Sequence, residues 1–235
     1  MHTYDYELIK NHIIVHQDDE TWLIDTGAPK TLSNYPTIKF AGVEYPTLTD
    51  FNLVNPGQLT PHVGVEITGL VGMDLLGKFP IEFNPVSSTM TIDAVPFPEG
   101  GFSLPMDDYL TIPIINVSFE GKSIRVVFDT GAQISYLDGS MTRDYDDLDL
   151  FSDFFPTLGE FQTQTRRVPF SINGSQVELL VGENPNFLQQ LFLVSDTVGI
   201  LGTELLKIFW VALLPTEDGR RKTGMAALQL TGDGG

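Results

Sequence analysis

The 235-residue sequence contains no cysteine, and its 31 acidic residues face only 13 lysines and arginines. Without cysteine, the chain can form no disulfide, no thiolate metal site and no cysteine nucleophile. The formal net charge of −18 repels phosphate backbones and anionic lipid, so neither nucleic acid nor a membrane is an expected partner. Apolar residues make up 42% of the chain, which is too many for a disordered protein.

Long hydrophobic runs are also missing. The longest apolar stretches, such as Ile208–Leu214, are far shorter than the roughly 20 residues that cross a bilayer. The first residues show no basic start followed by an apolar run, which a signal peptide would have. We therefore expect a cytoplasmic location, and a leader removed earlier is left open. The four histidines lack partners at metal-ligand spacing, so we expect no metal and no cofactor.

What is present are strand patterns. Short runs of valine, isoleucine, phenylalanine, tyrosine and threonine alternate with glycine, proline, asparagine and aspartate, which is typical of all-β proteins. Asn173-Gly174 indicates a hairpin with a type I′ turn, because both residues accept a positive φ. Helical patterns are few and short, the clearest being Met73–Phe79 and Thr203–Phe209. The sequence therefore predicts an all-β fold with few short helices.

An internal repeat is the most informative feature. Trp22–Ala28 (WLIDTGA) recurs as Val126–Ala132 (VVFDTGA). Further along, Leu70–Gly72 (LVG) recurs as Ile200–Gly202 (ILG), and each copy leads into a short helix pattern and then a hairpin pattern. Because the two pairs occur in the same order, the chain is interpreted as two diverged copies of one unit.

The repeat predicts the domain organisation. We expect an N-terminal lobe over 1–95, a linker rich in proline and glycine over 96–108, and a C-terminal lobe over 109–235. Each copy also has a hydroxyl residue three positions after the alanine, Thr31 and Ser135. Asp25 and Gly72 are 47 positions apart, whereas the equivalent Asp129 and Gly202 are 73 positions apart. The second copy therefore carries 26 additional residues between its motifs.

An aspartate at the end of an apolar strand is costly to bury unless it is hydrogen-bonded. The threonine and glycine that follow indicate a tight turn whose N–H groups can face the carboxylate. If the copies pack about a pseudo-twofold axis, Asp25 and Asp129 meet there and share one proton. Such a pair can activate a water molecule and protonate a peptide carbonyl, which is the equipment for peptide hydrolysis without a metal.

At these residues the sequence resembles the aspartic peptidases of the pepsin and retropepsin type. The resemblance implies a bilobal, pseudo-twofold fold and an endopeptidase that takes peptide or unfolded protein as its substrate. Because both motifs lie on one chain, we expect a monomer. The resemblance further implies that Asp25 and Asp129 are the catalytic pair. The residues that would support the two active-site loops are Thr26, Gly27, Ala28, Thr130, Gly131 and Ala132.

The flap is where the sequence departs from this family. Pepsin-like enzymes cover the cleft with a hairpin of the first lobe, but here the first copy runs almost directly into the hairpin pattern Ile38–Tyr45. We predict instead that the flap belongs to the second lobe, within roughly 154–167. The residues predicted near its tip are Leu158, Gly159, Glu160 and Phe161. The alternative is that 138–155, which is acidic and aromatic, is only a surface excursion.

The alanines carry a second prediction. A hydroxyl at the positions of Ala28 and Ala132 could donate to the catalytic carboxylates and favour their charged form. Since alanine cannot, the shared proton should persist to higher pH, with an optimum that is mildly acidic to near neutral. Two other functions stay open: a catalytically silent peptide-binding module that keeps the fold, and an enzyme that processes only itself.

Overall fold

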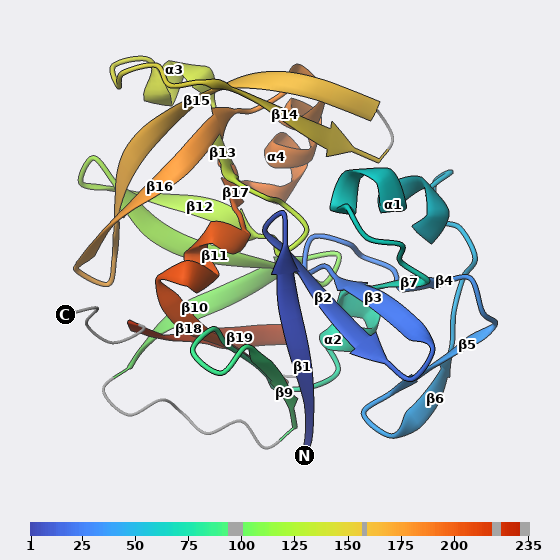
Figure 1. Ribbon diagram of the computed structural model, residues 1–235. Coiled ribbons are helices and arrows are strands. Elements are labelled where there is room, and N and C mark those ends of the chain that lie inside the picture. The colour runs from blue at the N-terminus through green and yellow to red at the C-terminus, as the bar shows by residue number, and fades with distance from the viewer. Residues whose placement is uncertain (94–100, 157–158, 218–221, 231–235) are drawn as a thin grey trace.

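Strands dominate the computed structural model, which confirms the predicted all-β class. The structure describes residues 1–93, 101–156, 159–217 and 222–230, and for 215–217 and 222–230 it describes only the backbone. Two lobes of curled sheet lie side by side (Figure 1), and the longest helix has eight residues. Within the described residues, no helix is long and apolar enough to cross a membrane.

The first lobe is built on three antiparallel strands, β1 (His2–Ile9), β2 (His12–Gln17) and β3 (Glu20–Ile24). β7 (Gly69–Val71) pairs in parallel with β3 and antiparallel with β4 (Leu32–Ser33). β3 therefore lies between β2 and β7 and is paired on both sides, so the loop that follows it leaves from a rigid strand end.

The second lobe repeats this arrangement strand for strand. β10 (Phe102–Tyr109), β11 (Ile112–Phe119) and β12 (Lys122–Phe128) are antiparallel. β17 (Gly199–Leu201) is parallel to β12 and antiparallel to β13 (Ser135–Leu137). The sequence repeat is thus a repeat of structure, and the two Asp-Thr-Gly (DTG) motifs, 25–27 and 129–131, follow equivalent strands.

Each lobe carries a hairpin between its two motifs. In the first lobe it is β5 (Thr37–Phe40) and β6 (Val43–Pro46). In the second it is β15 (Gly159–Ile172) and β16 (Ser175–Glu183), joined at Asn173-Gly174. The φ values at this turn are 49° and 86°, so both residues have the left-handed backbone that the type I′ prediction required.

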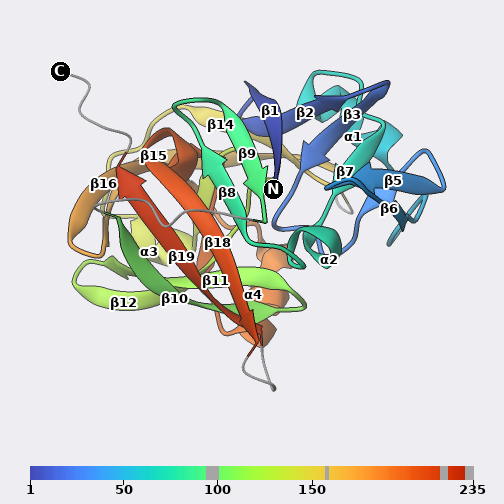
Figure 2. The same cartoon turned by 90° about the horizontal axis from the view of Figure 1, so that it is seen from below.

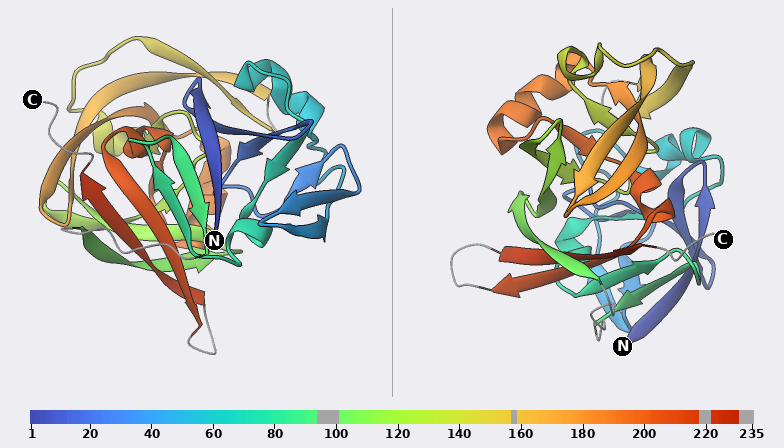
Figure 3. Two further views of the ribbon diagram at one scale, coloured as in Figure 1. Left: turned by 60° about the horizontal axis from the view of Figure 1, so that its bottom comes forward. Right: turned by 90° about the vertical axis from the view of Figure 1, so that its left-hand side faces the viewer.

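The additional residues of the second copy form a second hairpin. They begin with the short helix α3 (Gly139–Thr142) and continue as β14 (Leu150–Phe155), which pairs with the first part of β15. The end of this β14–β15 hairpin lies beside α1 (Pro56–Val63), a helix of the first lobe (Figure 1). Figure 3 shows the same proximity from another side, with β5 and β6 at the outer edge of the first lobe.

The helices occupy equivalent places in the two lobes. α2 (Met73–Leu76) and the 3₁₀ turn η2 (Thr203–Lys207) follow the apolar-glycine motifs, as predicted. α1 and α4 (Gln189–Ser195) each precede those motifs and were not predicted. A further turn, η1 (Asn186–Leu188), leads directly into α4.

A six-stranded antiparallel sheet joins the lobes. Its order is β1, β9 (Thr89–Ile92), β8 (Ile81–Asn84), β18 (Phe209–Glu217), β19 (Lys222–Leu230), β10. Three strands come from each half of the chain, and the central pair β8–β18 crosses between them. Figure 2 shows β9, β8, β18 and β19 side by side.

The predicted linker needs a correction. Residues 94–100 lie outside the described part of the chain, but Phe102–Tyr109 form β10 and pair with β19 and β11. The second half of the proposed linker 96–108 is therefore a strand of the shared sheet. The prolines and glycines of this segment outweighed the apolar–polar alternation of Phe102, Leu104 and Met106, which is a strand pattern. The division of the chain into lobes at these boundaries stays a prediction.

Large aromatic side chains fill the interior of the molecule. The fully buried ones are Trp22, Phe40, Phe83, Phe128, Phe170 and Phe209. Trp22 and Phe128 belong to the strands that end at the two DTG motifs. Because both side chains are buried in the core, their packing restricts the motion of those strands.

Candidate active site

Each DTG loop is attached to the strand that runs beneath it. The Asp25 N–H donates to the Val71 carbonyl oxygen at 3.0 Å, and the Asp129 N–H donates to that of Leu201 at 2.9 Å. These bonds continue the parallel pairs β3–β7 and β12–β17 by one residue. Both aspartates therefore have a backbone position set by the sheet rather than by a free loop.

The two predicted hydroxyl residues brace the loops in the same way. Thr31 Oγ1 accepts from the Gly72 N–H at 3.1 Å, and Ser135 Oγ accepts from the Gly202 N–H at 3.2 Å. A Cβ at either glycine would lie 2.7 Å or less from backbone atoms of its loop, so neither position has room for a side chain. The first lobe adds a carboxylate, because Asp74 accepts from the Thr31 hydroxyl at 2.7 Å.

The two threonines of the motifs bond across the lobes. Thr26 Oγ1 accepts from the Thr130 N–H at 2.9 Å and donates to the Phe128 carbonyl oxygen at 2.8 Å. Thr130 Oγ1 accepts from the Thr26 N–H at 3.0 Å and donates to the Ile24 carbonyl oxygen at 2.8 Å. Both side chains are fully buried. Four buried hydrogen bonds thus hold the two loops together.

The glycines of the motifs place each carboxyl group against the opposite loop. The Gly27 N–H donates to Asp25 Oδ1 at 2.8 Å, and the Gly131 N–H donates to Asp129 Oδ1 at 2.7 Å. A Cβ on Gly27 would lie 2.2 Å from Cγ of Asp129, and one on Gly131 would lie 2.5 Å from Cγ of Asp25. A side chain at either position would therefore overlap the opposite carboxyl group, so only glycine fits there.

The environment raises the pKa of both aspartates. Burial is the largest cause for each, and the Asp129 charge raises the pKa of Asp25 further. Hydrogen bonds from the Gly131 N–H and from the Asp25 carboxyl partly offset the rise for Asp129. Because the two carboxyl groups interact, they titrate as one unit with raised pKa values.

Asp25 and Asp129, called the dyad below, line a cavity of about 430 Å³ whose wall is mostly apolar. The first lobe contributes α1 and the segment before it, with Phe51, Val54, Leu59, His62 and Val63. The second lobe contributes the β14–β15 hairpin, with Asp153, Phe154, Phe155, Pro156 and Phe161. An apolar wall disfavours the charged form of a carboxyl group, and this raises the pKa values of the pair.

The β14–β15 hairpin reaches the opposite lobe. The Phe154 ring stacks on the His62 ring of α1, with centroids 3.6 Å apart and planes 8° from parallel. Glu160 Oε1 lies 3.7 Å from Nδ1 of the same histidine. Phe154 also packs against the apolar cluster of the first lobe that contains Leu59 and Val63. The hairpin thus bridges the cavity between the two lobes.

These contacts bear on the residues predicted for the flap. Leu158 lies outside the described residues, whereas Gly159, Glu160 and Phe161 are the first residues of β15. Phe161 lines the cavity, and of the described first-lobe residues that line it, none belongs to β5 or β6. The end of the segment 138–155 forms part of the cavity wall, so reading it as a surface excursion alone is wrong.

Two parts of the site were missed by the sequence reasoning. Helix α1 has a local signal, because Asn55 and Gln58 form a capping box and Gly64 ends the helix at φ 92°. Asp153 also has one, since it is the single charge in the aromatic run 151–155. Within the described residues, no group of three histidine, aspartate or glutamate side chains is arranged to hold a metal ion.

Comparisons with known proteins support the fold. No family model matches the chain, and no curated protein matches it in sequence. Among solved structures it is similar to the aspartic proteinase from Irpex lacteus, with 12% identity, a TM-score of 0.54 and coverage of 98% of this chain and 97% of that one. A retropepsin-like aspartic protease from Rickettsia conorii aligns at 15% identity and a TM-score of 0.36, over 55% of this chain and 95% of that one.

The first of these similarities spans nearly the full length of both chains. The protein therefore has the bilobal, all-β fold of the pepsin-like aspartic proteinases. At this identity the likeness concerns the fold, and the function has to be argued from the site.

Proposed function

We propose that the protein is an aspartic endopeptidase with Asp25 and Asp129 as its catalytic pair. The observation that carries the proposal is the mutual arrangement of the two DTG loops. Four buried hydrogen bonds of Thr26 and Thr130 fix them, and each carboxyl rests against the opposite glycine. A purely structural pair of buried acids would not need this symmetric support.

The reaction follows from the shared proton. Ionised Asp129 takes a proton from a water molecule, and the oxygen of that water forms a bond to the peptide carbonyl carbon. At the same time Asp25 gives its proton to the carbonyl oxygen. The tetrahedral intermediate then returns a proton to Asp25. As the carbon–nitrogen bond breaks, the leaving nitrogen receives the proton held by Asp129. No covalent intermediate forms, and the pair ends in its starting protonation state.

The cavity wall supports an extended peptide as the substrate. An extended chain could add to the edge of β14–β15 by main-chain hydrogen bonds and place alternate side chains in the apolar cavity. In this proposal the β14–β15 hairpin is the substrate-binding flap, with Gly159, Glu160 and Phe161 close to its turn. The flap would then come from the second lobe and close against helix α1 of the first.

The test is cleavage of a denatured protein with and without a statine inhibitor, which mimics the tetrahedral intermediate. We expect Asp25→Asn and Asp129→Asn each to lower the rate by about a thousandfold or more, because either change removes the acid–base pair. Asp149→Asn, an exposed aspartate just before β14, is the matched control and should cleave normally. Undiminished cleavage by both dyad variants would refute the proposal.

The same experiment separates the other functions. A silent peptide-binding module would bind the statine or the denatured substrate and cleave nothing. An enzyme that processes only itself would change its own mass over time and leave the added substrate intact. Mass spectrometry of both the chain and the substrate in one time course distinguishes the three cases.

A further inference from the structure

A third carboxylate faces the cavity that holds the dyad. Asp153 lies on β14, and its Oδ2 accepts a short hydrogen bond from the Tyr136 hydroxyl. Its Oδ1 accepts from Gln133 Nε2 at 3.0 Å and from the Phe154 N–H at 2.8 Å. Gln133 is also bound by the first lobe, because the Asn11 side-chain amide donates to its main-chain carbonyl oxygen at 3.0 Å. The carboxylate is thus oriented by three donors.

All three donors are neutral, so they orient the charge of Asp153 without cancelling it. Among the described residues, no lysine, arginine or histidine forms an ion pair with this carboxylate. Its field nevertheless reaches the catalytic centre, because the Asp153 charge raises the pKa of Asp129 and that of Tyr136. Asp153 also lines the same cavity as Asp25 and Asp129, so a group bound to it lies in the space where the proposed reaction takes place.

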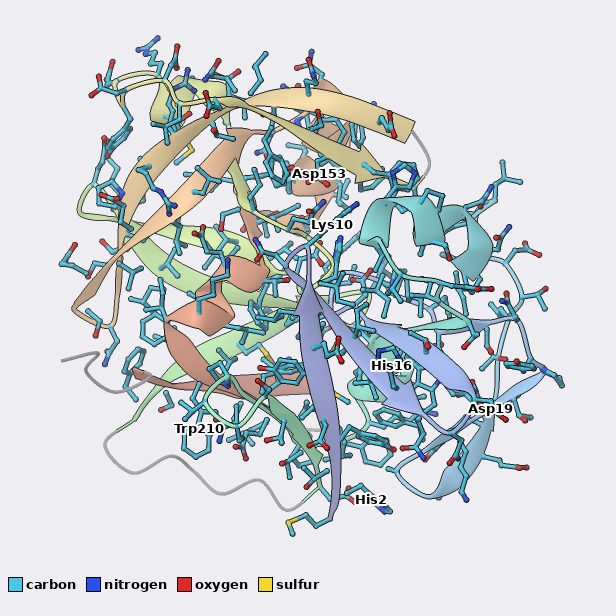
Figure 4. The ribbon with its side chains drawn as sticks, in the orientation of Figure 1. His2, Lys10, His16, Asp19, Asp153 and Trp210 are labelled. Carbon is cyan, nitrogen blue, oxygen red and sulfur yellow. The ribbon has the colours of Figure 1, made fainter. Side chains whose placement is uncertain are left out.

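The cations near the cavity are engaged elsewhere or lie at its rim. Lys10, at the turn between β1 and β2, donates to the His62 carbonyl oxygen at 3.2 Å (labelled with Asp153 in Figure 4). Lys30 is exposed at the edge. Burial lowers the pKa of His12 to about 4, so this cavity histidine is neutral at mildly acidic pH. Asp153 thus faces the cavity with neutral hydrogen-bond donors and, among the described residues, no ion pair, so a cationic group that enters the cavity can pair with it.

We infer that Asp153 forms a subsite for a cationic side chain of the substrate, a lysine or an arginine next to the cleaved bond. The inference rests on the proposed function and names its substrate class. The aliphatic stem of such a side chain fits the apolar wall, while its charged end pairs with the carboxylate. Binding would also neutralise the charge that raises the pKa of Asp129. The preference agrees with a chain whose net charge is −18, which attracts basic peptides.

The test compares peptides that differ only in lysine or norleucine at each of the positions flanking the cut. Norleucine keeps the stem and removes the charge. We expect wild-type kcat/KM to favour the lysine peptide at one position by about tenfold or more, as for a charge-assisted hydrogen bond. In Asp153→Asn the lysine-to-norleucine ratio should fall to about one. The ratio is taken within each variant, so a general loss of activity or stability cancels.

The control for net charge is Asp149→Asn, which removes an exposed carboxylate before the same strand and should keep the lysine preference. Equal rates for lysine and norleucine in the wild type would overturn the inference. A preference that survives in Asp153→Asn would assign it to another group and equally overturn it.

A binding measurement separates this inference from the proposed function. Calorimetry with the Asp25→Asn variant measures the affinity for both peptides without hydrolysis, and the double variant Asp25→Asn/Asp153→Asn gives the reference. Tighter binding of the lysine peptide that needs Asp153, in a protein whose wild type cuts neither peptide, would support the subsite and refute the peptidase. Cleavage of both peptides at equal rates, with equal affinities, would support the peptidase and refute the subsite.

Discussion

At the scale of single residues, two buried threonines connect the two lobes. Thr26 and Thr130 each donate one hydrogen bond and accept another across the lobes, so each hydroxyl satisfies two backbone groups that water cannot reach. Serine has the same hydroxyl, whereas alanine would leave a buried N–H and a buried carbonyl without partners. These residues thus link the stability of the whole chain to the geometry of the dyad.

Thr26→Ala should lower the free energy of unfolding by about 2–4 kcal/mol, since two buried backbone groups lose their partner. Thr26→Ser keeps the oxygen and should lose less than half as much. Urea unfolding followed by tryptophan fluorescence measures both. Equal losses in the two variants would show that the methyl group, rather than the hydroxyl, carries the effect.

In the proposed mechanism, Asp25 and Asp129 set the pH dependence of activity. Burial raises the pKa of Asp25 and of Asp129, and the Asp129 charge raises that of Asp25 further. Activity requires one proton on the pair, so it falls at low pH when both are protonated and at high pH when both are ionised. Because both pKa values are raised, the active range moves upward, and the rate measured from pH 2 to 8 should peak in the mildly acidic to near-neutral range. A maximum at about pH 2–3 would contradict this.

Ala28→Ser tests the cause of that range. A hydroxyl beside Asp25 would donate to the carboxylate and favour its charged form, which lowers its pKa. The alkaline limb of the pH profile should therefore move to lower pH. Ala28→Gly adds no donor and should leave the limb where it is; a shift of the same size in both variants would point to altered packing instead.

At the scale of elements, the contact between the β14–β15 hairpin and helix α1 is the least expected feature. The 26 additional residues of the second copy extend β15 and add β14, and the hairpin then reaches the first lobe through Phe154, Glu160 and His62. α1 begins with a capping box at Asn55, so the helix that receives the hairpin is locally stable. The hairpin's position over the dyad therefore depends on a contact between lobes.

His62→Ala should weaken that contact and raise KM for a peptide, or Kd for a statine inhibitor, by about 2–10-fold through the loss of ring stacking. His62→Phe keeps an aromatic ring against Phe154 but removes Nδ1, so its KM should stay close to that of the wild type. If both variants raise KM equally, the polar contact with Glu160 holds the hairpin; an unchanged KM in His62→Ala would argue against a role for α1 in closing the cavity.

At the scale of the whole molecule, one chain supplies both halves of the site. The shared sheet takes three strands from each half, with β8 and β18 paired at its centre. The two DTG loops meet where these halves join. A chain built this way contains the complete dyad and its support without a second copy.

Specific activity should therefore stay constant over a thousandfold dilution, and the sedimentation coefficient should be that of a single chain of 26.0 kDa. An enzyme whose dyad formed between two chains would lose activity on dilution as the dimer dissociates. A fall in specific activity at low concentration would show that this protein needs a partner copy as well.

The sequence by itself determined the duplication, the all-β class and the residues of both DTG loops. It could do so because these features are local: an apolar strand, a turn that needs glycine and an aspartate that burial would otherwise penalise occur together within seven residues, twice. The hairpin at Asn173-Gly174 was predictable for the same reason, as the turn type follows from two adjacent residues.

Only the tertiary structure decided which groups surround the dyad. His62, Asp153 and Tyr136 are far apart in the sequence and carry no shared pattern, and they come together because the β14–β15 hairpin folds over a helix of the other lobe. Strand β10 was hidden in a segment rich in proline because its partners, β19 and β11, come later in the chain. Contacts between distant segments depend on how whole elements pack, and no window of adjacent residues contains that information.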